Sequence, residues 1–236
     1  MSAHESAAVT AVREQVAAMH AELPRNGLVV WTAGNVSGRV PGEPHFVIKP
    51  SGLAFDELTP ESMVLCDLGG NVVPDSLGSH RSASSDTFAH AHVYRAMPHV
   101  GGVVHTHSPY ATAWAARQEP IPCVITGMAD EFGGDIPVGP FAIIGDASIG
   151  EAIVATLSGS RSRAVLMANH GVFTIGNDAR DAVKAAVMCE DAARTVHLAR
   201  QLGEPVRLPA ATVDALFDRY QNVYGQRPSP QQGAPS

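Results

Sequence analysis

Two histidines separated by a single residue, His105 and His107, are the residues of this 236-residue chain whose type and spacing first suggest chemistry. They end an apolar, β-prone run, Val100–His107. Side chains at positions i and i+2 of a strand point to the same face, so the two imidazoles can converge on one metal ion at Zn–N distances of about 2.0–2.1 Å. Taken alone, the pair also fits two polar residues at the end of a strand.

A third histidine, His170, strengthens the metal interpretation. It lies in an Asn-His-Gly tripeptide between two β-prone runs, Ala164–Ala168 and Val172–Ile175, so we expect a tight turn that holds its imidazole at a strand end. Three histidines with a fourth ligand or a water are typical of a catalytic metal site. The chain has 11 histidines in all. The others are interpreted as helix-surface, capping or unpaired residues: His4, His20, His45, His80, His90, His92, His99 and His197.

Three short polar segments have the composition of an anion-binding cradle. Residues 34–37 follow an expected strand, and residues 49–52 combine a cation, a hydroxyl and a glycine. Ser84 and Ser85 stand where a helix is expected to begin, and the N–H groups of a helix N-terminus favour an anion. Each segment alone also fits an ordinary turn or cap, and the chain has neither a P-loop nor a dinucleotide-binding glycine fingerprint. The candidate substrate-binding residues are Asn35, Ser37, Lys49, Ser51, Gly52, Ser84 and Ser85.

The elements that must position these residues alternate between short β-rich runs and helical stretches, which favours one mixed α/β domain. Strands are expected at 28–32, 46–49, 100–107, 164–168 and 172–175, and a hairpin at 64–73. Helices are expected at about 6–21, stopped by Pro24, at 86–97 capped by Ser85, from Pro109, from the cap Asp178 to about 201, and at 211–220. Residues 227–236 are rich in Pro, Gln, Gly and Ser and are expected to be disordered, which leaves residues 1–226 as the domain.

Composition excludes several classes of function. Sixteen Lys+Arg against 23 Asp+Glu give a formal net charge of −7, which disfavours nucleic-acid binding. No apolar run approaches the roughly 20 residues that span a bilayer, and the first residues lack the features of a signal peptide. Three widely spaced cysteines fit a reducing compartment better than a disulfide framework. We therefore expect a cytoplasmic protein that binds neither nucleic acid nor membranes.

Five segments, in order along the chain, resemble the class II aldolase/adducin family. They are TAGNVSG (32–38), IKPSG (48–52), SSDTFAHAHVY (84–94), GGVVHTHSPYATAWA (101–115) and NHGVFTIG (169–176). The resemblance covers about residues 10–226 and implies a three-layer fold with a central, mostly antiparallel β-sheet flanked by helices. It also implies a homotetramer with active sites between adjacent subunits. The family's metal ligands carry over onto His105, His107 and His170, and its phosphate site onto Asn35, Lys49, Ser51, Gly52, Ser84 and Ser85.

Within the family, the chain is most similar to the 4-epimerases of L-ribulose 5-phosphate. Its Ser-Ser-Asp-Thr segment has Asp86 where fuculose- and rhamnulose-phosphate aldolases typically have glutamate. The resemblance implies that Asp86 is a fourth metal ligand and that Asp130 and Tyr224 are the acid/base residues, Tyr224 in a neighbour's site. The chain departs from the epimerase pattern at Glu131, where tyrosine is usual, and in residues 213–220, which lack a histidine common in that region.

The implied reaction is metal-dependent C4 epimerisation of L-ribulose 5-phosphate to D-xylulose 5-phosphate, by retro-aldol cleavage and re-addition. One Zn²⁺ per subunit suits three imidazoles and a carboxylate, and Mn²⁺ or Co²⁺ would also fit. Two alternatives use the same metal chemistry, a sugar-phosphate aldolase of the fuculose-phosphate type and a decarboxylase. A third is a non-catalytic structural domain like the adducin head. The expected partners are a small phosphorylated sugar and further copies of the chain.

Overall fold

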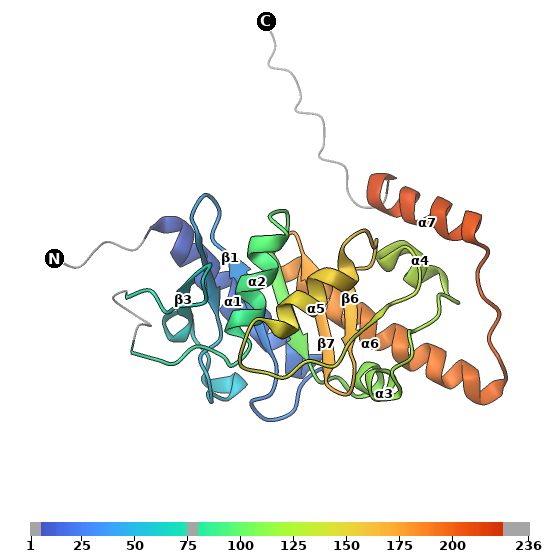
Figure 1. Ribbon diagram of the computed structural model, residues 1–236, viewed down its shortest axis with the longest axis horizontal. Coiled ribbons are helices and arrows are strands. Elements are labelled where there is room, and N and C mark those ends of the chain that lie inside the picture. The colour runs from blue at the N-terminus through green and yellow to red at the C-terminus, as the bar shows by residue number, and fades with distance from the viewer. Residues whose placement is uncertain (1–5, 75–79, 224–236) are drawn as a thin grey trace, which may run out of the picture.

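A seven-stranded sheet forms the centre of the computed structural model, which describes residues 6–74 and 80–223 (Figure 1). The strand order is β3-β2-β1-β4-β7-β6-β5, and every neighbouring pair is antiparallel except β5 and β6. The strands are β1 (Asn35–Arg39), β2 (His45–Ile48), β3 (Val64–Asp67), β4 (Gly102–Thr106), β5 (Val138–Gly139), β6 (Ala164–Met167) and β7 (Gly171–Gly176). The expected mixed α/β fold with a mostly antiparallel sheet is confirmed.

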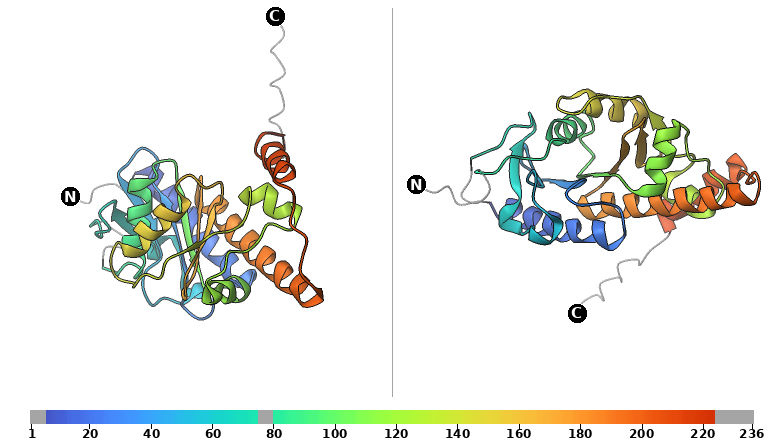
Figure 2. Two further views of the ribbon diagram at one scale, coloured as in Figure 1. Left: turned by 45° about the vertical axis from the view of Figure 1, so that its right-hand side comes forward. Right: turned by 90° about the horizontal axis from the view of Figure 1, so that it is seen from below.

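Helices cover both faces of the sheet, which gives three layers. Seen from below, α2 and α5 lie on one side of the strands, and α1 and α6 lie on the other (Figure 2). The helices are α1 (Ala7–Arg25), α2 (Thr87–Ala96), α3 (Pro109–Arg117), α4 (Thr126–Phe132), α5 (Ser148–Leu157), α6 (Ala179–Leu202) and α7 (Ala210–Val223), with short 3-10 helices at Phe55–Glu57 and Pro60–Ser62. Among the described residues, no helix has the length and apolarity needed to cross a membrane.

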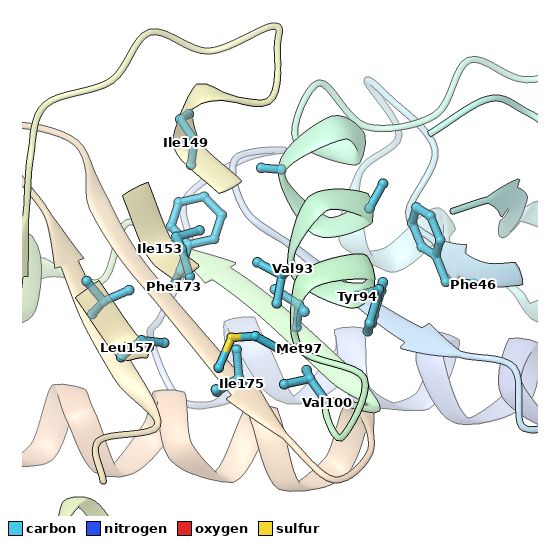
Figure 3. Close-up of a cluster of buried hydrophobic side chains, with 14 of the residues drawn as sticks. Phe46, Val93, Tyr94, Met97, Val100, Ile149, Ile153, Leu157, Phe173 and Ile175 are labelled. Atoms are coloured by element: carbon cyan, nitrogen blue, oxygen red, sulfur yellow. The ribbon is translucent and has the colours of Figure 1, made fainter. Parts of the chain in front are cut away.

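The strands supply alternate side chains to the two layers, as a two-residue period requires. Val103 of β4 packs with α2 and α5, whereas the next residue, Val104, packs with α1 and α6. Phe173 and Ile175 of β7 join Val103 on the first side (Figure 3). These side chains are almost fully buried, and each such burial stabilises the fold by about 1.5–3 kcal/mol. Strands β4 and β7, which carry or flank the three histidines, are therefore firmly held by packing on both faces of the sheet.

The strand expected at 28–32 is wrong, because this segment forms a turn and the strand begins at Asn35. The N–H of Ala33 donates to the carbonyl of Val30 (3.1 Å), and Trp31 between them has φ +58°. Apolar composition suggested a strand, but Val30 and Trp31 are 73% and 85% exposed. No strand of the described sheet is left to pair with them, since β1 already lies between β2 and β4.

Two helix expectations also need correction. Pro24 does not end the first helix, which continues to Arg25. A proline in the last turn removes only one backbone donor, and the N–H of Asn26 still reaches the carbonyl of Glu22 (3.1 Å). Helices α4 and α5 were not expected, because neither is introduced by a side chain that caps its N-terminus. The segment 227–236, like Tyr224, lies outside the described residues, so its expected disorder stays a prediction.

A buried histidine joins the first helix to the first strand. The Nδ1–H of His20 donates to the carbonyl of Val16 (2.7 Å), and its Nε2 accepts from the N–H of Val36 (2.9 Å). Complete burial, opposed by the bond to Val16 and assisted by the charge of Lys49, lowers the pKa of His20 from 6.5 to about 3. His20 is therefore a neutral structural residue that fixes β1 next to Asn35.

We expect this histidine to make the fold acid-sensitive. Between pH 6.5 and about 3 the unfolded chain binds a proton at His20 that the folded chain does not bind. The free energy of unfolding therefore decreases as the pH falls through this range, by up to about 1.4 kcal/mol per pH unit. Denaturant midpoints measured between pH 7.5 and 5 should show this decrease. The His20→Gln variant should be less stable at pH 7.5 but should lose less stability on acidification, whereas the exposed His99→Gln should behave as the unmodified chain.

Candidate metal site and anion-binding cleft

The three histidines singled out by their spacing converge at one end of β4 and β7. One ring nitrogen from each of His105, His107 and His170 lies within 4.8 Å of the others, and no other such group of three occurs in the part of the chain that the structure describes. The His105 ring stacks on Phe173 with centroids 4.2 Å apart. Its Nδ1–H donates to the carbonyl of Val172 (3.0 Å), which leaves Nε2 as the free ligand atom.

The donor set fits a divalent transition metal ion. Burial lowers the pKa of all three histidines, and their mutual repulsion lowers the pKa values of His105 and His170 further. They are therefore neutral near pH 7, as metal binding requires. The Nε2 atom of His107 is buried without a hydrogen-bond partner, which is costly unless an ion or a water binds there.

The backbone next to His170 passes very close to the segment that carries His105 and His107. A Cβ at Gly171 would lie 2.6 Å from the carbonyl oxygen of Thr106 and 2.7 Å from Cδ2 of His107, so only glycine fits. Asn169 occupies the left-handed region with φ +57°, which asparagine tolerates better than most residues. The Asn-His-Gly sequence therefore brings His170 against the His105–His107 pair.

Asp86 borders the same cluster from the N-terminus of α2. One carboxylate oxygen, Oδ2, accepts from Nδ2 of Asn35 (2.7 Å), while Oδ1 is buried without a partner. Its negative charge raises the pKa values of His107 and His170 against the larger effect of burial. Asp86 is not part of the compact three-histidine group, however. The structure thus brings the expected fourth ligand to the cleft without placing it among the convergent donors.

A polar cleft of about 240 Å³ opens in front of the histidines. It brings together the expected phosphate-binding residues except Ser37. The cleft is lined by Thr32, Ala33, Gly34, Asn35, Lys49, Pro50, Ser51, Gly52, Ser84, Ser85, Asp86, His105, His107, Ile144 and His170. Ile144 had no signal in the sequence, because it ends a short apolar run, residues 141–144, that forms neither a helix nor a strand. The cleft is large enough for a small sugar phosphate and unites all three polar segments with the metal candidates.

Lys49 is the cation of this cleft, and it has no acidic partner among the described residues. The residue is only 2% exposed, and its Nζ donates to the carbonyls of Pro50 (3.3 Å) and Thr32 (3.5 Å). None of the ion pairs between described residues includes it. Desolvation by burial lowers the pKa of its amine. A buried ammonium without a counter-ion is costly, so this position is prepared for an anion.

Ser37 lies behind the cleft and does not line it. Its hydroxyl is hydrogen-bonded to Nδ1 of His90 and to the hydroxyl of Tyr94, both at 2.7 Å. All three residues are buried, and burial lowers the pKa of His90 to about 3. The expectation for His90 as a helix-surface or capping residue is therefore wrong, and Ser37, expected as a substrate contact, is not among the residues that line the cleft. The alternation of side chains puts Ser37 on the same face as Asn35 but two residues farther from the cleft.

Asp130 lies in α4 and is absent from the cleft formed by the described residues of its own chain. Its Oδ1 is buried without a hydrogen-bond partner, and its carbonyl accepts from the side chain of Gln221 near the end of α7 (3.5 Å). Tyr224, the other expected acid/base residue, lies just beyond the described residues. Asp130 and the end of α7 thus belong to one corner of the molecule, separate from the histidines of the same chain.

Comparison with a family model identifies the class of protein. The model for the class II aldolase and adducin N-terminal domain matches residues 14–197. This range contains all three histidines, Asp86, Lys49 and Asp130.

Solved structures of similar fold support this match over most of both chains. An L-fuculose 1-phosphate aldolase is 27% identical with a TM-score of 0.80, covering 92% of this chain and 98% of that one. YgbL from Klebsiella pneumoniae, described as a putative aldolase/epimerase/decarboxylase, is 28% identical with a TM-score of 0.75, covering 88% of this chain and 98% of that one. An aldolase II superfamily protein from Pseudomonas syringae shares the fold at 22% identity, with a TM-score of 0.79 and coverage of 93% and 88%.

Proposed function

The chain belongs to the class II aldolase and adducin family, and we propose that it is a metal-dependent enzyme that breaks and re-forms a C–C bond in a phosphorylated sugar. The observation that carries this proposal is the position of Lys49. A buried lysine without a carboxylate partner lines the same small cleft as three convergent histidines. The first feature suits a phosphate and the second a divalent cation, so a substrate with a phosphate at one end fits both.

We assign the reaction as C4 epimerisation of L-ribulose 5-phosphate to D-xylulose 5-phosphate. Bound to the three imidazoles, a divalent ion such as Zn²⁺, Mn²⁺ or Co²⁺ would supply Lewis-acid stabilisation of the negative charge that develops when C3–C4 breaks. Lys49 and the cradle hydroxyls hold the phosphate of the departing aldehyde. Because this fragment stays anchored while its carbonyl turns, the bond re-forms on the opposite face and C4 is inverted.

Two acid/base groups on opposite sides of C4 complete this scheme. One of Asp130 and Tyr224 removes the proton of the C4 hydroxyl, which drives cleavage, and the other returns a proton after re-addition. Since Asp130 does not line the cleft of its own chain, we infer that both groups reach the cleft of an adjacent copy. This arrangement favours a closed oligomer, which we propose to be a homotetramer. Asp86 borders the histidines and orients Asn35.

The alternative is a sugar-phosphate aldolase, which cleaves the bond without re-addition. The likeness to the L-fuculose 1-phosphate aldolase supports it. Aspartate at position 86 favours the epimerase, because the fuculose- and rhamnulose-phosphate aldolases typically have glutamate at this position.

One assay separates these functions. Purified protein loaded with Zn²⁺ or Mn²⁺ is incubated with L-ribulose 5-phosphate, and D-xylulose 5-phosphate and glycolaldehyde phosphate are followed together. The epimerase predicts D-xylulose 5-phosphate as the main product, whereas an aldolase accumulates the free aldehyde. Release of carbon dioxide from a carboxylated substrate would instead support a decarboxylase. Protein that binds no divalent ion and converts none of these substrates would support a structural domain.

We expect the Lys49→Met variant to bind the substrate weakly. A charge-assisted hydrogen bond contributes about 1.5–3 kcal/mol, so KM for the sugar phosphate should increase about 10–100-fold, while kcat changes less. Inorganic phosphate should inhibit the unmodified enzyme competitively and the variant much less. The matched control is Arg117→Met, because this arginine is 67% exposed and lies outside the cleft. An unchanged KM in Lys49→Met would contradict the assignment of the phosphate to this residue.

A further inference from the structure

Lysine is rare in this chain, and both lysines occupy unusual places. Only two of the 16 basic residues are lysine, Lys49 and Lys184. The first lies in the cleft. The second lies on α6 at the corner where α4, α6 and α7 meet, on the right of Figure 1. A lysine ammonium is a compact point charge, whereas an arginine presents a wide planar fork. Lys184 therefore places a compact cation at this corner.

The first contact of Lys184 is a buried carboxylate. The side chain of Glu131 is 2% exposed, and its Oε2 lies 2.9 Å from Nζ of Lys184. Burial lowers the pKa of Lys184, but the bond to Glu131, with a smaller effect of Tyr220, outweighs it and raises the pKa overall. Removing a carboxylate from water is strongly unfavourable unless a cation compensates it. Lys184 thus stabilises Glu131, the neighbour of Asp130, in the interior of α4.

The second contact of Lys184 is with α7. Its Nζ lies 5.3 Å from the ring centroid of Tyr220, a distance at which a cation attracts an aromatic face. Helix α7 has one buried residue, Val213, in its described length. Its remaining attachments include the ion pair of Arg161 with Asp214 (2.5 Å) and the weak bond of Gln221 to the carbonyl of Asp130 (3.5 Å). Leu216 also packs against the core, so it is the part of α7 beyond Leu216 that is attached mainly by polar and cation–π contacts.

We propose that Lys184 is the positioning residue of the acid/base corner. By binding Glu131 and Tyr220 at once, it holds α4 and the end of α7 together. Asp130, one acid/base group, is the residue before Glu131, and Tyr220 precedes the other, Tyr224, by four residues in the sequence. The ammonium group therefore fixes Asp130 relative to the described end of α7. The inference rests on the proposed function, in which these two groups serve the cleft of an adjacent copy. It also explains the glutamate at position 131, because a buried carboxylate there is the anchor for Lys184.

The test uses the double variant Glu131→Gln, Lys184→Met, which removes both charges and so leaves no unpaired buried carboxylate. We expect kcat to fall about 10²-fold, as for a misplaced catalytic group, while KM changes less than about threefold and the bound metal is unchanged. Amide hydrogen exchange in α7 should become at least about tenfold faster. The matched control is Arg200→Met, which removes an ion pair with Glu119 (3.1 Å) and a cation–π contact with Trp114 (4.5 Å) from the same helix. It should change neither kcat nor exchange in α7.

Mixed oligomers separate this positioning role from a general loss of structure. His107→Ala subunits lack a working cleft but keep a normal corner, whereas the double variant keeps a normal cleft. In oligomers formed from an equal, random mixture of the two variants, each site takes its cleft from one subunit and its corner from the next. About a quarter of the sites then combine a normal cleft with a normal corner, so the mixture should regain up to about a quarter of the unmodified activity. A mixture of Asp130→Asn with His107→Ala is the reference. If only the reference mixture recovers, or if the double variant keeps normal kcat, the role of Lys184 is wrong and the proposed function stands. If the reference mixture does not recover, the shared site of the proposed function fails, and the inference fails with it.

Discussion

The His107→Ala variant is expected to lose both its bound divalent ion and its turnover. Two imidazoles remain after this change, and the lost ligand is the one whose Nε2 is buried without a hydrogen-bond partner among the described residues. A bound metal ion contributes several kcal/mol of charge stabilisation in the transition state, so we expect activity on the sugar phosphate to fall by about 10³-fold. Metal analysis of the purified variant and initial rates with added Zn²⁺ or Mn²⁺ measure the two effects together.

The control for this prediction is His99→Ala. His99 is exposed and lies outside the cleft, so its removal should leave both metal content and turnover unchanged. The thermal stability of the metal-free His107→Ala variant should match that of the unmodified protein after chelation, because the Nε2 atom of His107 has no hydrogen-bond partner among the described residues. A His107→Ala variant that keeps one metal ion per subunit and normal turnover would rule out the three-histidine site.

The Asp130→Asn variant is expected to separate metal binding from catalysis. Asparagine has nearly the same shape as aspartate but cannot take up or return a proton at neutral pH. An acid/base group typically contributes about 10²–10⁴-fold to the rate, so turnover should fall within this range. The three histidines are untouched, and metal content should stay at the unmodified level. Rates with L-ribulose 5-phosphate and metal analysis of the same sample provide the comparison.

Asp218→Asn is the matched control, since Asp218 is an exposed aspartate of α7 that only accepts a bond from Asn222 (2.8 Å). It should retain normal turnover and normal metal content. If Asp130→Asn were fully active, Asp130 would be an ordinary residue of α4 and the acid/base role would have to be sought elsewhere, first at Asp86. Loss of the metal in Asp130→Asn would point instead to a disturbed fold.

The metal cluster was predictable because its determinants are local. The i, i+2 spacing of His105 and His107 fixes their common face as soon as the segment is a strand. The residue after His170 is glycine because there is no room for a side chain beside His107. A Cβ at Gly171 would lie 2.7 Å from Cδ2 of His107. Lys49 was likewise recognisable as the cation of a polar loop. These features depend on neighbours within a few residues, so the sequence contains them directly.

Other features depend on contacts between distant segments and could not be predicted from local patterns. Ser37 and His90 meet through the packing of α2 on β1, and nothing in the neighbourhood of either residue indicates the other. The same holds for Glu131, whose partner Lys184 is on another helix. Val30 and Trp31 have strand-forming side chains but no strand beside them, since pairing is decided by the whole sheet. The prediction from apolar composition therefore placed a strand at residues 28–32, where the chain forms a turn.

The order of the strands also determines when, during folding, the metal site is completed. β4 lies between β1 and β7, which come from distant parts of the chain. His105 and His107 are paired as soon as β4 is extended, but His170 joins them only when β7 docks along β4. The chain must lose the conformational entropy of closing a long loop before it gains the free energy of the β4–β7 contacts. We therefore expect the docking of β7 along β4 late in folding. An ion held by all three imidazoles therefore binds only once this docking has occurred. It prolongs the lifetime of the folded chain by slowing unfolding, and it leaves the rate of folding almost unchanged.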